Sequence, residues 1–169
     1  MQFIRCTHKL LRELKIKPAA TAEAEAGCLG GWHANLILIE RKKCVLFTSD
    51  TTLYSIFVPG LKKRDFESFS EVFRYNLISS LKNDGFSAME IEKALREYQD
   101  IEFAITDSRS VLGSMNDLVL HLKYWIDSEG GLKLVNLDDL NKRLNRIIMG
   151  AIKYANGIEM LKIKLAEHD

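Results

Sequence analysis

Apolar residues repeat with a helical period most clearly between Asp107 and Asp127. At 100° per residue they form one continuous stripe, made up of Val111, Leu112, Met115, Leu118, Val119, Leu122, Trp125 and Ile126. Asp107 or Ser108 can cap the first turn by accepting backbone N–H bonds, and Gly130-Gly131 offers permissive dihedrals for the end. We therefore predict a long amphipathic helix around which the rest of the chain packs. The positions that we expect to be nearly fully buried are Met115, Val119, Leu122 and Ile126.

The flanks of this stripe carry specific hydrogen-bonding groups. One flank contains Ser110, Ser114, Asp117 and His121, and the other contains Arg109, Asn116 and Lys123. The serines and Gly113 are mediocre helix formers that cost roughly 0.5 to 1 kcal/mol each relative to alanine, which points to a role other than helix stability. Close packing or solvation is the simpler explanation, and a binding surface is the alternative.

Short runs rich in β-branched and aromatic residues predict the strands, at Gln2–Cys6, His33–Ile39, Cys44–Ser49, Leu53–Val58 and Ile101–Thr106. The middle three are separated by turns near Arg41-Lys42 and Asp50-Thr51, which is typical of an antiparallel meander. Because the central parts of these strands are apolar on both faces, we expect helices on both sides of the sheet.

The remaining helical patterns are shorter. They cover Thr7–Leu14, Asp65–Leu81, a segment opened by the capping box Ser87–Glu90, a segment from the cap Asn136 through Ile148, and about Ile158–Ala166. Between the first helix and the meander, Pro18–Gly27 lacks apolar periodicity and is predicted to be a loop. Together these patterns predict a single α+β domain over residues 1–169, with a mainly antiparallel sheet of four to five strands packed against five to six helices.

Composition narrows the class of protein. The chain has 169 residues, of which 47% are hydrophobic and 28% charged, and its formal net charge is +1. These values are typical of a soluble globular domain, and the net charge gives no reason to expect a nucleic-acid partner, although a local basic patch stays open. No apolar run approaches the roughly 20 residues of a membrane span, and no signal-peptide pattern is present. We therefore expect a cytoplasmic protein without a membrane partner.

The sequence offers no pattern for a metal or a cofactor. Cys6, Cys28 and Cys44 are odd in number and widely spaced, which favours reduced thiols over a disulfide framework or a zinc site. GxGxxG, Walker A, HExxH and GxSxG motifs are absent from the sequence. We predict neither a metal nor a cofactor.

His33 is the leading candidate for chemistry. If the first hairpin turns at Arg41-Lys42, three pairs share one face of the sheet: Ile39 with Cys44, Asn35 with Thr48, and His33 with Asp50. A histidine beside a carboxylate has the geometry of a general base and its orienting group, for which Thr48, Ser110 or Ser114 would be candidate nucleophiles. A structural hydrogen-bonded pair is the more common role of such a histidine.

Further polar groups follow the central helix. Asn141 and Asn145 lie one helical turn apart with Arg143 and Arg146 nearby, which is compatible with binding a phosphate or a nucleotide base and equally with a solvated face. We favour the solvated face. The basic runs Arg41-Lys42-Lys43 and Lys62-Lys63-Arg64 are interpreted as aids to solubility.

Several motifs occur in an order that resembles a known family of bacterial proteins. They are IRCTHKLLREL near the start, WHANL, KCVLFTSDTTLYS, RSVLGSMNDL and the late LNR, MGAIKY and GIEMLK. The resemblance spans nearly the whole chain and is to a domain of unknown function, so it implies no activity, ligand or catalytic residue. The residues it marks are Trp32, His33, Asn35, Arg109, Ser110, Ser114, Asn116, Asp117 and Asn145. Relative to that family, Pro18–Gly27 is expanded.

Two functional hypotheses follow. The first is a non-catalytic binding or regulatory module that holds a protein partner or a small polar ligand. Its expected ligand-binding residues are Trp32, His33, Asn35, Arg109, Ser110, Ser114, Asn116 and Asp117, with the hairpin end and one helix flank sharing a concave pocket. The alternative is a hydrolase-type enzyme that uses His33 as general base.

Overall fold

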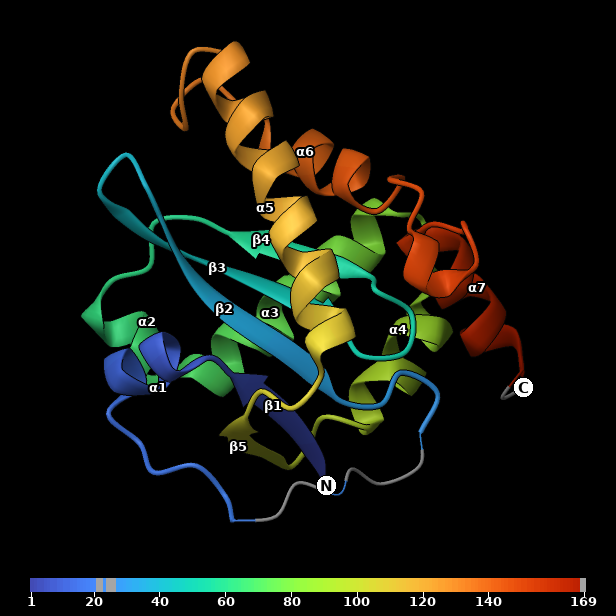
Figure 1. Ribbon diagram of the computed structural model, residues 1–169. Coiled ribbons are helices and arrows are strands. Elements are labelled where there is room, and N and C mark those ends of the chain that lie inside the picture. Colours follow the sequence, from blue (N-terminus) through green and yellow to red (C-terminus); the bar gives the residue numbers. More distant parts are fainter. Residues whose placement is uncertain (21–22, 24–26, 168–169) are drawn as a thin grey trace.

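The computed structural model describes residues 1–20, 23 and 27–167 (Figure 1). The strands form one sheet in the order β4-β3-β2-β1-β5. Their bounds are β1 Gln2–Cys6, β2 Trp32–Ile39, β3 Lys42–Ser49, β4 Ser55–Val58 and β5 Ile101–Ile105. The helices are α1 His8–Leu14, α2 Lys63–Glu67, α3 Phe69–Asn83, α4 Ala88–Arg96, α5 Arg109–Ser128, α6 Leu137–Leu144 and α7 Gly157–Glu167. The α+β class is confirmed, and the described ranges contain seven α-helices rather than five or six.

The sheet is mixed, so the prediction of a mainly antiparallel sheet was wrong. The meander β2-β3-β4 is antiparallel as expected, but β1 pairs in parallel with both β2 and β5. A hairpin can be predicted from its short local turn. A parallel pair is joined by a long crossover connection, which no short-range sequence pattern predicts. Here α1 provides one crossover and the α2–α4 segment provides the other.

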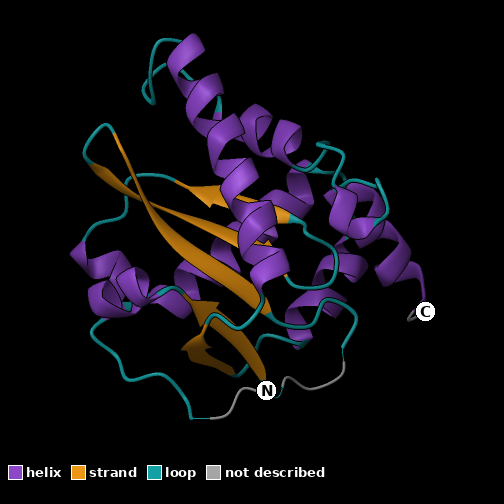
Figure 2. Cartoon of the chain, in the orientation of Figure 1, coloured by secondary structure: helices purple, strands orange, loops and turns teal. Residues whose placement is uncertain are grey.

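Helices cover both faces of the sheet, as the doubly apolar strands predicted (Figure 2). α5 and α6 pack on one face, and α1, α3 and α4 pack on the other. The second face holds an aromatic core in which the Trp32 and Phe73 rings meet edge to face at 5.1 Å. Because side chains alternate along a strand, Trp32 and its neighbour His33 point to opposite faces.

The central helix is confirmed as α5, which crosses the front of the sheet in Figure 1. Its cap is Ser108, whose Oγ accepts a bond from the Val111 backbone N–H at 3.2 Å. Of the four positions expected to be nearly fully buried, Met115, Leu122 and Ile126 are so. Val119 is only half-buried, because it lies at the edge of the stripe rather than at its centre.

The first hairpin turns one residue earlier than predicted. Glu40 and Arg41 both have positive φ, at 52° and 63°, which forms a two-residue turn. Ile39 therefore pairs with Lys42, and His33 pairs with Thr48 rather than with Asp50. Moving the turn by one residue shifts every partner by two, so each side chain keeps its predicted face while its predicted partner changes.

Other boundaries differ in smaller ways. The pattern over 65–81 is split into α2 and α3, which meet at Ser68. The helix capped by Asn136 ends at Leu144, well before Ile148. Of the predicted loop over 18–27, the described positions 18–20, 23 and 27 are in neither helix nor strand, and the others lie outside the described residues. The helices of the described ranges are too short or too polar to cross a lipid bilayer.

Candidate functional site

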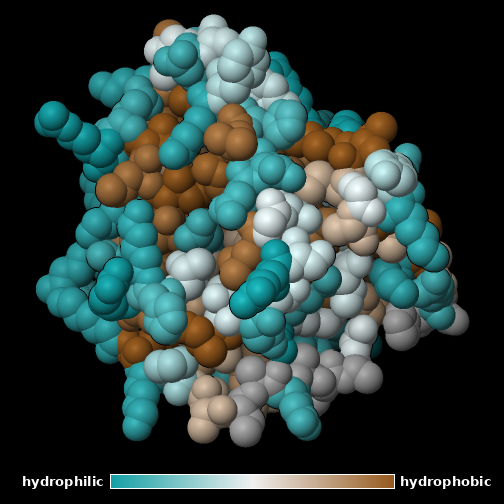
Figure 3. Space-filling view, viewed as in Figure 1, coloured by the Kyte–Doolittle hydropathy of each residue, from teal (hydrophilic) through white to brown (hydrophobic). Residues whose placement is uncertain are grey.

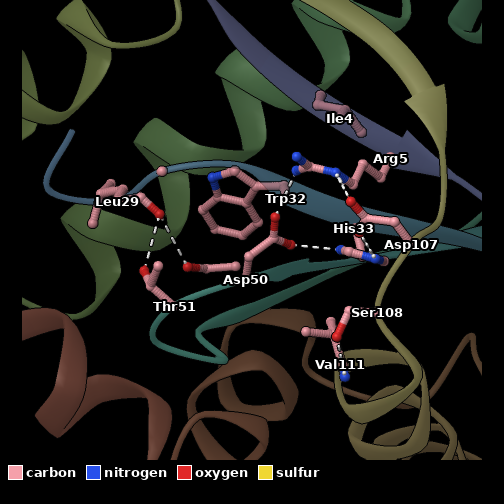
Figure 4. A network of polar contacts seen from close by, with 12 residues as sticks. Ile4, Arg5, Leu29, Trp32, His33, Asp50, Thr51, Asp107, Ser108 and Val111 are labelled. Atoms are coloured by element: carbon pink, nitrogen blue, oxygen red, sulfur yellow. Dashed lines mark hydrogen bonds and ion pairs between the residues drawn. The ribbon is translucent and has the colours of Figure 1, made fainter. Parts of the chain in front are cut away.

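Four charged or titratable side chains converge where three strands meet the first turn of α5 (Figure 4). We call Arg5, His33, Asp50 and Asp107 the charged cluster. Parallel pairing places Arg5 beside His33, and also beside Ala104 of β5, three residues before Asp107. Asp50 comes from the turn that follows β3. The crossover topology therefore assembles groups that are far apart in the sequence.

Each carboxylate of the charged cluster bridges the arginine and the histidine. Asp50 lies with Oδ1 2.5 Å from His33 Nδ1, and its Oδ2 accepts a bond from Arg5 Nη1 at 2.8 Å. Asp107 places Oδ2 2.9 Å from Arg5 Nε and Oδ1 3.4 Å from His33 Nε2. The cluster is thus a closed ring of alternating basic and acidic groups.

The charged cluster is largely withdrawn from water. The side chains of Arg5 and His33 are 8% and 1% exposed, whereas those of Asp50 and Asp107 are 22% and 57% exposed. Buried charges are costly unless they are paired and hydrogen-bonded, and here each basic group meets two carboxylates. The arrangement ties the start of α5 to β1 and β2, with Asp107 as its solvent-facing member.

Gly31 makes room for this ring. A Cβ at Gly31 would lie 2.4 Å from Arg5 Nη1 and 2.8 Å from Asp50 Oδ2. The preceding loop is anchored by Glu97, whose carboxylate accepts bonds from the backbone N–H groups of Cys28, at 2.7 Å, and Gly30, at 3.3 Å. The Cys28 thiol also donates to Glu97, at 2.6 Å. Burial, with a smaller contribution from Glu97, raises the pKa of the Cys28 thiol to about 12, so the thiol stays protonated and structural.

The pair of His33 and Asp50 was predicted, and their contact is confirmed although the predicted register was wrong. Asp50 reaches His33 from the turn rather than from a paired strand position. Among the described hydrogen bonds none joins His33 to a hydroxyl. Thr48 Oγ1 instead lies 2.8 Å from Ser55 Oγ. The second ring nitrogen, Nε2, faces Asp107.

A groove runs along α5 away from the charged cluster. It has a volume of about 720 Å³ between α5 and the segment that follows α6. Its lining comprises Ser114, Asp117, Leu120, His121, Tyr124, Trp125, Ile147, Ile148, Met149, Gly150 and Ala151. We call it the α5 groove. It combines aromatic and aliphatic surface with the carboxylate of Asp117, as binding sites commonly do.

Large apolar side chains border the α5 groove and face solvent. Leu120 is 67% exposed, Tyr124 72% and Ile148 66%. Figure 3 shows apolar surface on either side of the upper part of α5. Within the groove the rings of His121 and Trp125 lie 5.5 Å apart, and the Arg143 guanidinium lies 5.9 Å from the Trp125 ring. Exposed apolar patches of this kind mark interaction surfaces more often than isolated apolar residues do.

The residues predicted to bind a ligand fall into separate places. Ser114 and Asp117 line the α5 groove. Ser110 is exposed one turn earlier on the same flank, and Arg109 and Asn116 are also exposed. Asn35 is half-buried. The structure thus brings part of one helix flank into a groove.

The hairpin end is not part of the α5 groove. Neither His33 nor Asn35 lines it, so the predicted shared pocket is not formed there. Asn35 Oδ1 accepts a bond from Thr7 Oγ1 at 3.1 Å. Trp32 is fully buried in the core of the other face, where its Nε1 donates to the Tyr98 hydroxyl at 2.8 Å. That hydroxyl donates in turn to the Gly30 carbonyl at 2.8 Å.

The solvated face predicted for Asn141 and Asn145 was wrong, although Arg143 and Arg146 are exposed. Both amides are buried against the outer edge of β4. Asn145 accepts from Ser55 N at 2.7 Å and donates to Ser55 O at 2.8 Å, and Asn141 makes the same pair of bonds with Phe57 at 2.8 and 3.3 Å. The two side chains satisfy backbone groups that an edge strand would otherwise leave unpaired.

Arg5, Asp107 and Gly31 were not recognised from the sequence as members of a site. Arg5 could have indicated the site, because it is a charged residue within a predicted apolar strand. A charged side chain is rarely buried without a partner, so a partner was to be expected. The partner could not be identified, because a parallel register has no local signature.

Comparison with known proteins agrees with the resemblance found in the motifs. The family described as a domain of unknown function, DUF6933, matches residues 3–160. No curated protein matches the chain.

Proposed function

Because the chain belongs to the DUF6933 family, a domain of unknown function, we propose its role from the site alone: a non-catalytic binding module that docks a protein partner in the α5 groove. The observation that carries this proposal is the exposure of Leu120, Tyr124 and Ile148 around one groove. Burying such side chains against a partner removes apolar surface from water, which favours association.

The polar lining of the α5 groove supports a specific partner. Asp117 offers a carboxylate for a basic or hydrogen-bonding group, and Ser114 offers a hydroxyl. Trp125 already accepts the Arg143 guanidinium near its ring, which indicates that cationic groups are compatible with this part of the groove. We therefore propose a partner segment with an apolar side chain beside a basic one.

The two tryptophans allow a direct test. Trp125 lines the α5 groove, whereas Trp32 is fully buried in the opposite core. Peptides selected from a random library on sparsely immobilised protein should shift Trp125 fluorescence and protect it from acrylamide. Replacing Tyr124 by alanine should weaken binding at least about tenfold, the effect of losing one well-packed aromatic contact.

Tyr75 provides the matched control. It is also 72% exposed, and it lies on α3, which packs on the other face of the sheet. A Tyr75→Ala protein should bind the selected peptides as the unchanged protein does. Peptides that bind both alanine variants equally well would show that the groove is not the docking surface, and a library that yields no binder would count against the module itself.

The hydrolase hypothesis remains the second candidate, and one observation favours it. His33 Nδ1 lies 2.5 Å from Asp50 Oδ1, which is the arrangement of a general base and its orienting carboxylate. The pair also sits where the connections from β1 and β5 diverge to opposite faces, a place where open sheets often bind ligands. A panel of acyl and phosphoester substrates tests it: hydrolysis that disappears in His33→Ala but persists in Tyr124→Ala would replace the binding proposal.

We also propose a cytoplasmic location. Cys6, Cys28 and Cys44 are buried free thiols, which is the usual state of cysteines in a reducing compartment. Measuring the redox state of the three thiols in protein isolated under alkylating conditions tests this, and a disulfide between any two would contradict it.

A further inference from the structure

We propose that the partner is a second copy of this chain, docked on the exposed side of α5, which includes the groove residues Asp117, Leu120 and Tyr124. In this pair the two α5 helices run antiparallel across a twofold axis. The inference rests on the proposed function, because it names an occupant for that surface. A second copy is indicated because the surface carries both halves of each contact that a twofold axis requires.

The exposed side of α5 has the spacing of a helix–helix seam. Ser110, Gly113, Asp117, Leu120, Tyr124 and Asp127 follow one another at alternating intervals of three and four residues. This is the pattern by which a helix presents a continuous stripe to another helix. The stripe lies opposite the one formed by Met115 and Leu122, which face the sheet. A second helix can therefore approach α5 without disturbing its own core.

Shape complementarity is provided by one glycine and one tyrosine. Gly113 sits within α5, and a Cβ built there would meet nothing within 4 Å. Tyr124 is 72% exposed on the same side of the helix. Gly113 and Tyr124 are equidistant from the point between residues 118 and 119. In an antiparallel pair centred there, each Tyr124 ring lies over the Gly113 of the second copy, where no side chain obstructs it.

The same axis produces further complementary contacts. Asp117 and Leu120 straddle the same point, so the Asp117 of one copy faces the Leu120 and the adjacent His121 of the other. Asp117 and the opposing His121 differ in level by only about one residue's rise, roughly 1.5 Å. With so small an offset along the helix axis, a carboxylate and an imidazole on facing helices can reach each other to form a hydrogen bond, and the axis makes this contact twice.

A contact made mainly by one helix from each copy is small, so we expect a weak dimer with a Kd of about 10 to 100 µM. Sedimentation equilibrium measures it over concentrations up to about 500 µM. Replacing Gly113 by tyrosine makes two rings collide, and replacing Tyr124 by glycine leaves two gaps. Each change alone should raise the Kd at least about tenfold.

The decisive experiment mixes these two variants. In a pair of one Gly113→Tyr chain and one Tyr124→Gly chain, each tyrosine again faces a glycine, so a 1:1 heterodimer should form with near-original affinity. This recovery requires that residues 113 and 124 both lie in the contact between the two copies. Tyr75→Gly is the control for replacing an exposed tyrosine by glycine in a helix outside the proposed contact. Circular dichroism confirms that each variant is folded.

The possible outcomes separate this inference from the proposed function. A chain that stays monomeric throughout overturns self-docking, while peptide binding in the α5 groove is judged by its own assay. A dimer that both variants leave intact uses another surface, which also overturns the inference. Loss in the single variants without recovery on mixing would exclude the antiparallel pairing.

Discussion

The charged cluster and the α5 groove both involve α5, yet they differ in which kind of side chain is buried and which is exposed. In the cluster Arg5 and His33 are almost completely buried, and each lies close to two carboxylates. In the groove Leu120 and Tyr124 are mostly exposed and are covered by no described part of the chain. Polar groups thus occupy the interior of one region, and apolar groups occupy the surface of the other.

This contrast separates stability from interaction. Paired buried charges contribute mainly by avoiding the large cost of an unpaired charge, so they hold the structure in one arrangement. Exposed apolar side chains contribute little to the isolated fold and gain free energy when a partner covers them. Variants in the cluster should therefore affect unfolding, and variants in the groove should affect association.

The largest effect is expected at Arg5. An Arg5→Met protein keeps the side-chain length but leaves Asp50 and Asp107 without their shared cation, which should lower the free energy of unfolding by about 3 to 5 kcal/mol. Urea denaturation measures this. Arg109→Met, at the exposed first residue of α5, should change stability by less than about 0.5 kcal/mol. A loss below about 1 kcal/mol at Arg5 would mean that the cluster does not hold the fold.

Two leucines of α5 divide the helix into its two roles. Leu122 is fully buried, so Leu122→Ala should cost about 2 to 5 kcal/mol through lost burial and the cavity left behind. Leu120 is 67% exposed, and Leu120→Ala should cost less than about 0.5 kcal/mol while weakening binding in the groove. Thermal melts and the peptide assay provide the two readouts. Equal losses of stability would remove the distinction between the faces.

Replacing glycine by alanine should change the stability of the fold in opposite directions at two positions. Gly31→Ala forces Arg5 and Asp50 apart and should destabilise the fold by about 1 to 3 kcal/mol. Gly113→Ala places a methyl group in open space on a helix and should stabilise it by about 0.5 to 1 kcal/mol. Chemical denaturation of both proteins decides the matter, and destabilisation by both would show that Gly113 is needed by the fold itself.

Alkaline pH should give the smallest effect, on the loop that supports the charged cluster. The folded state raises the pKa of Cys28 from 9.0 to about 12, chiefly through burial. The unfolded chain therefore releases this proton first, so the contribution of the thiol to stability is complete below pH 9 and is lost as the pH rises toward 12. Between pH 8 and about 10.5, the free energy of unfolding should fall more steeply with pH for the original protein than for Cys28→Ala. Chemical denaturation at each pH measures it. Parallel curves would assign the alkaline loss to other groups.

The sequence by itself determined the features that depend on neighbours along the chain. The apolar stripe of α5, the Ser108 cap and the capping box at Ser87 each involve residues within about one helical turn, where side-chain spacing fixes the local geometry. The antiparallel meander was predictable for a similar reason, since its turns are short. The position of the first turn was missed by one residue because both of its central residues lack the usual glycine or asparagine.

Only the tertiary structure decided which distant residues meet. Parallel pairing of β1 with β2 and β5 brings Arg5 to His33 and Asp107, and no local pattern encodes that register. Asn141 and Asn145 resembled a solvated helix face, yet the edge of β4 buries both amides because its backbone groups need partners. The sequence around Ile148 did not predict the α5 groove. A groove between a helix and a later loop exists only once the chain has packed.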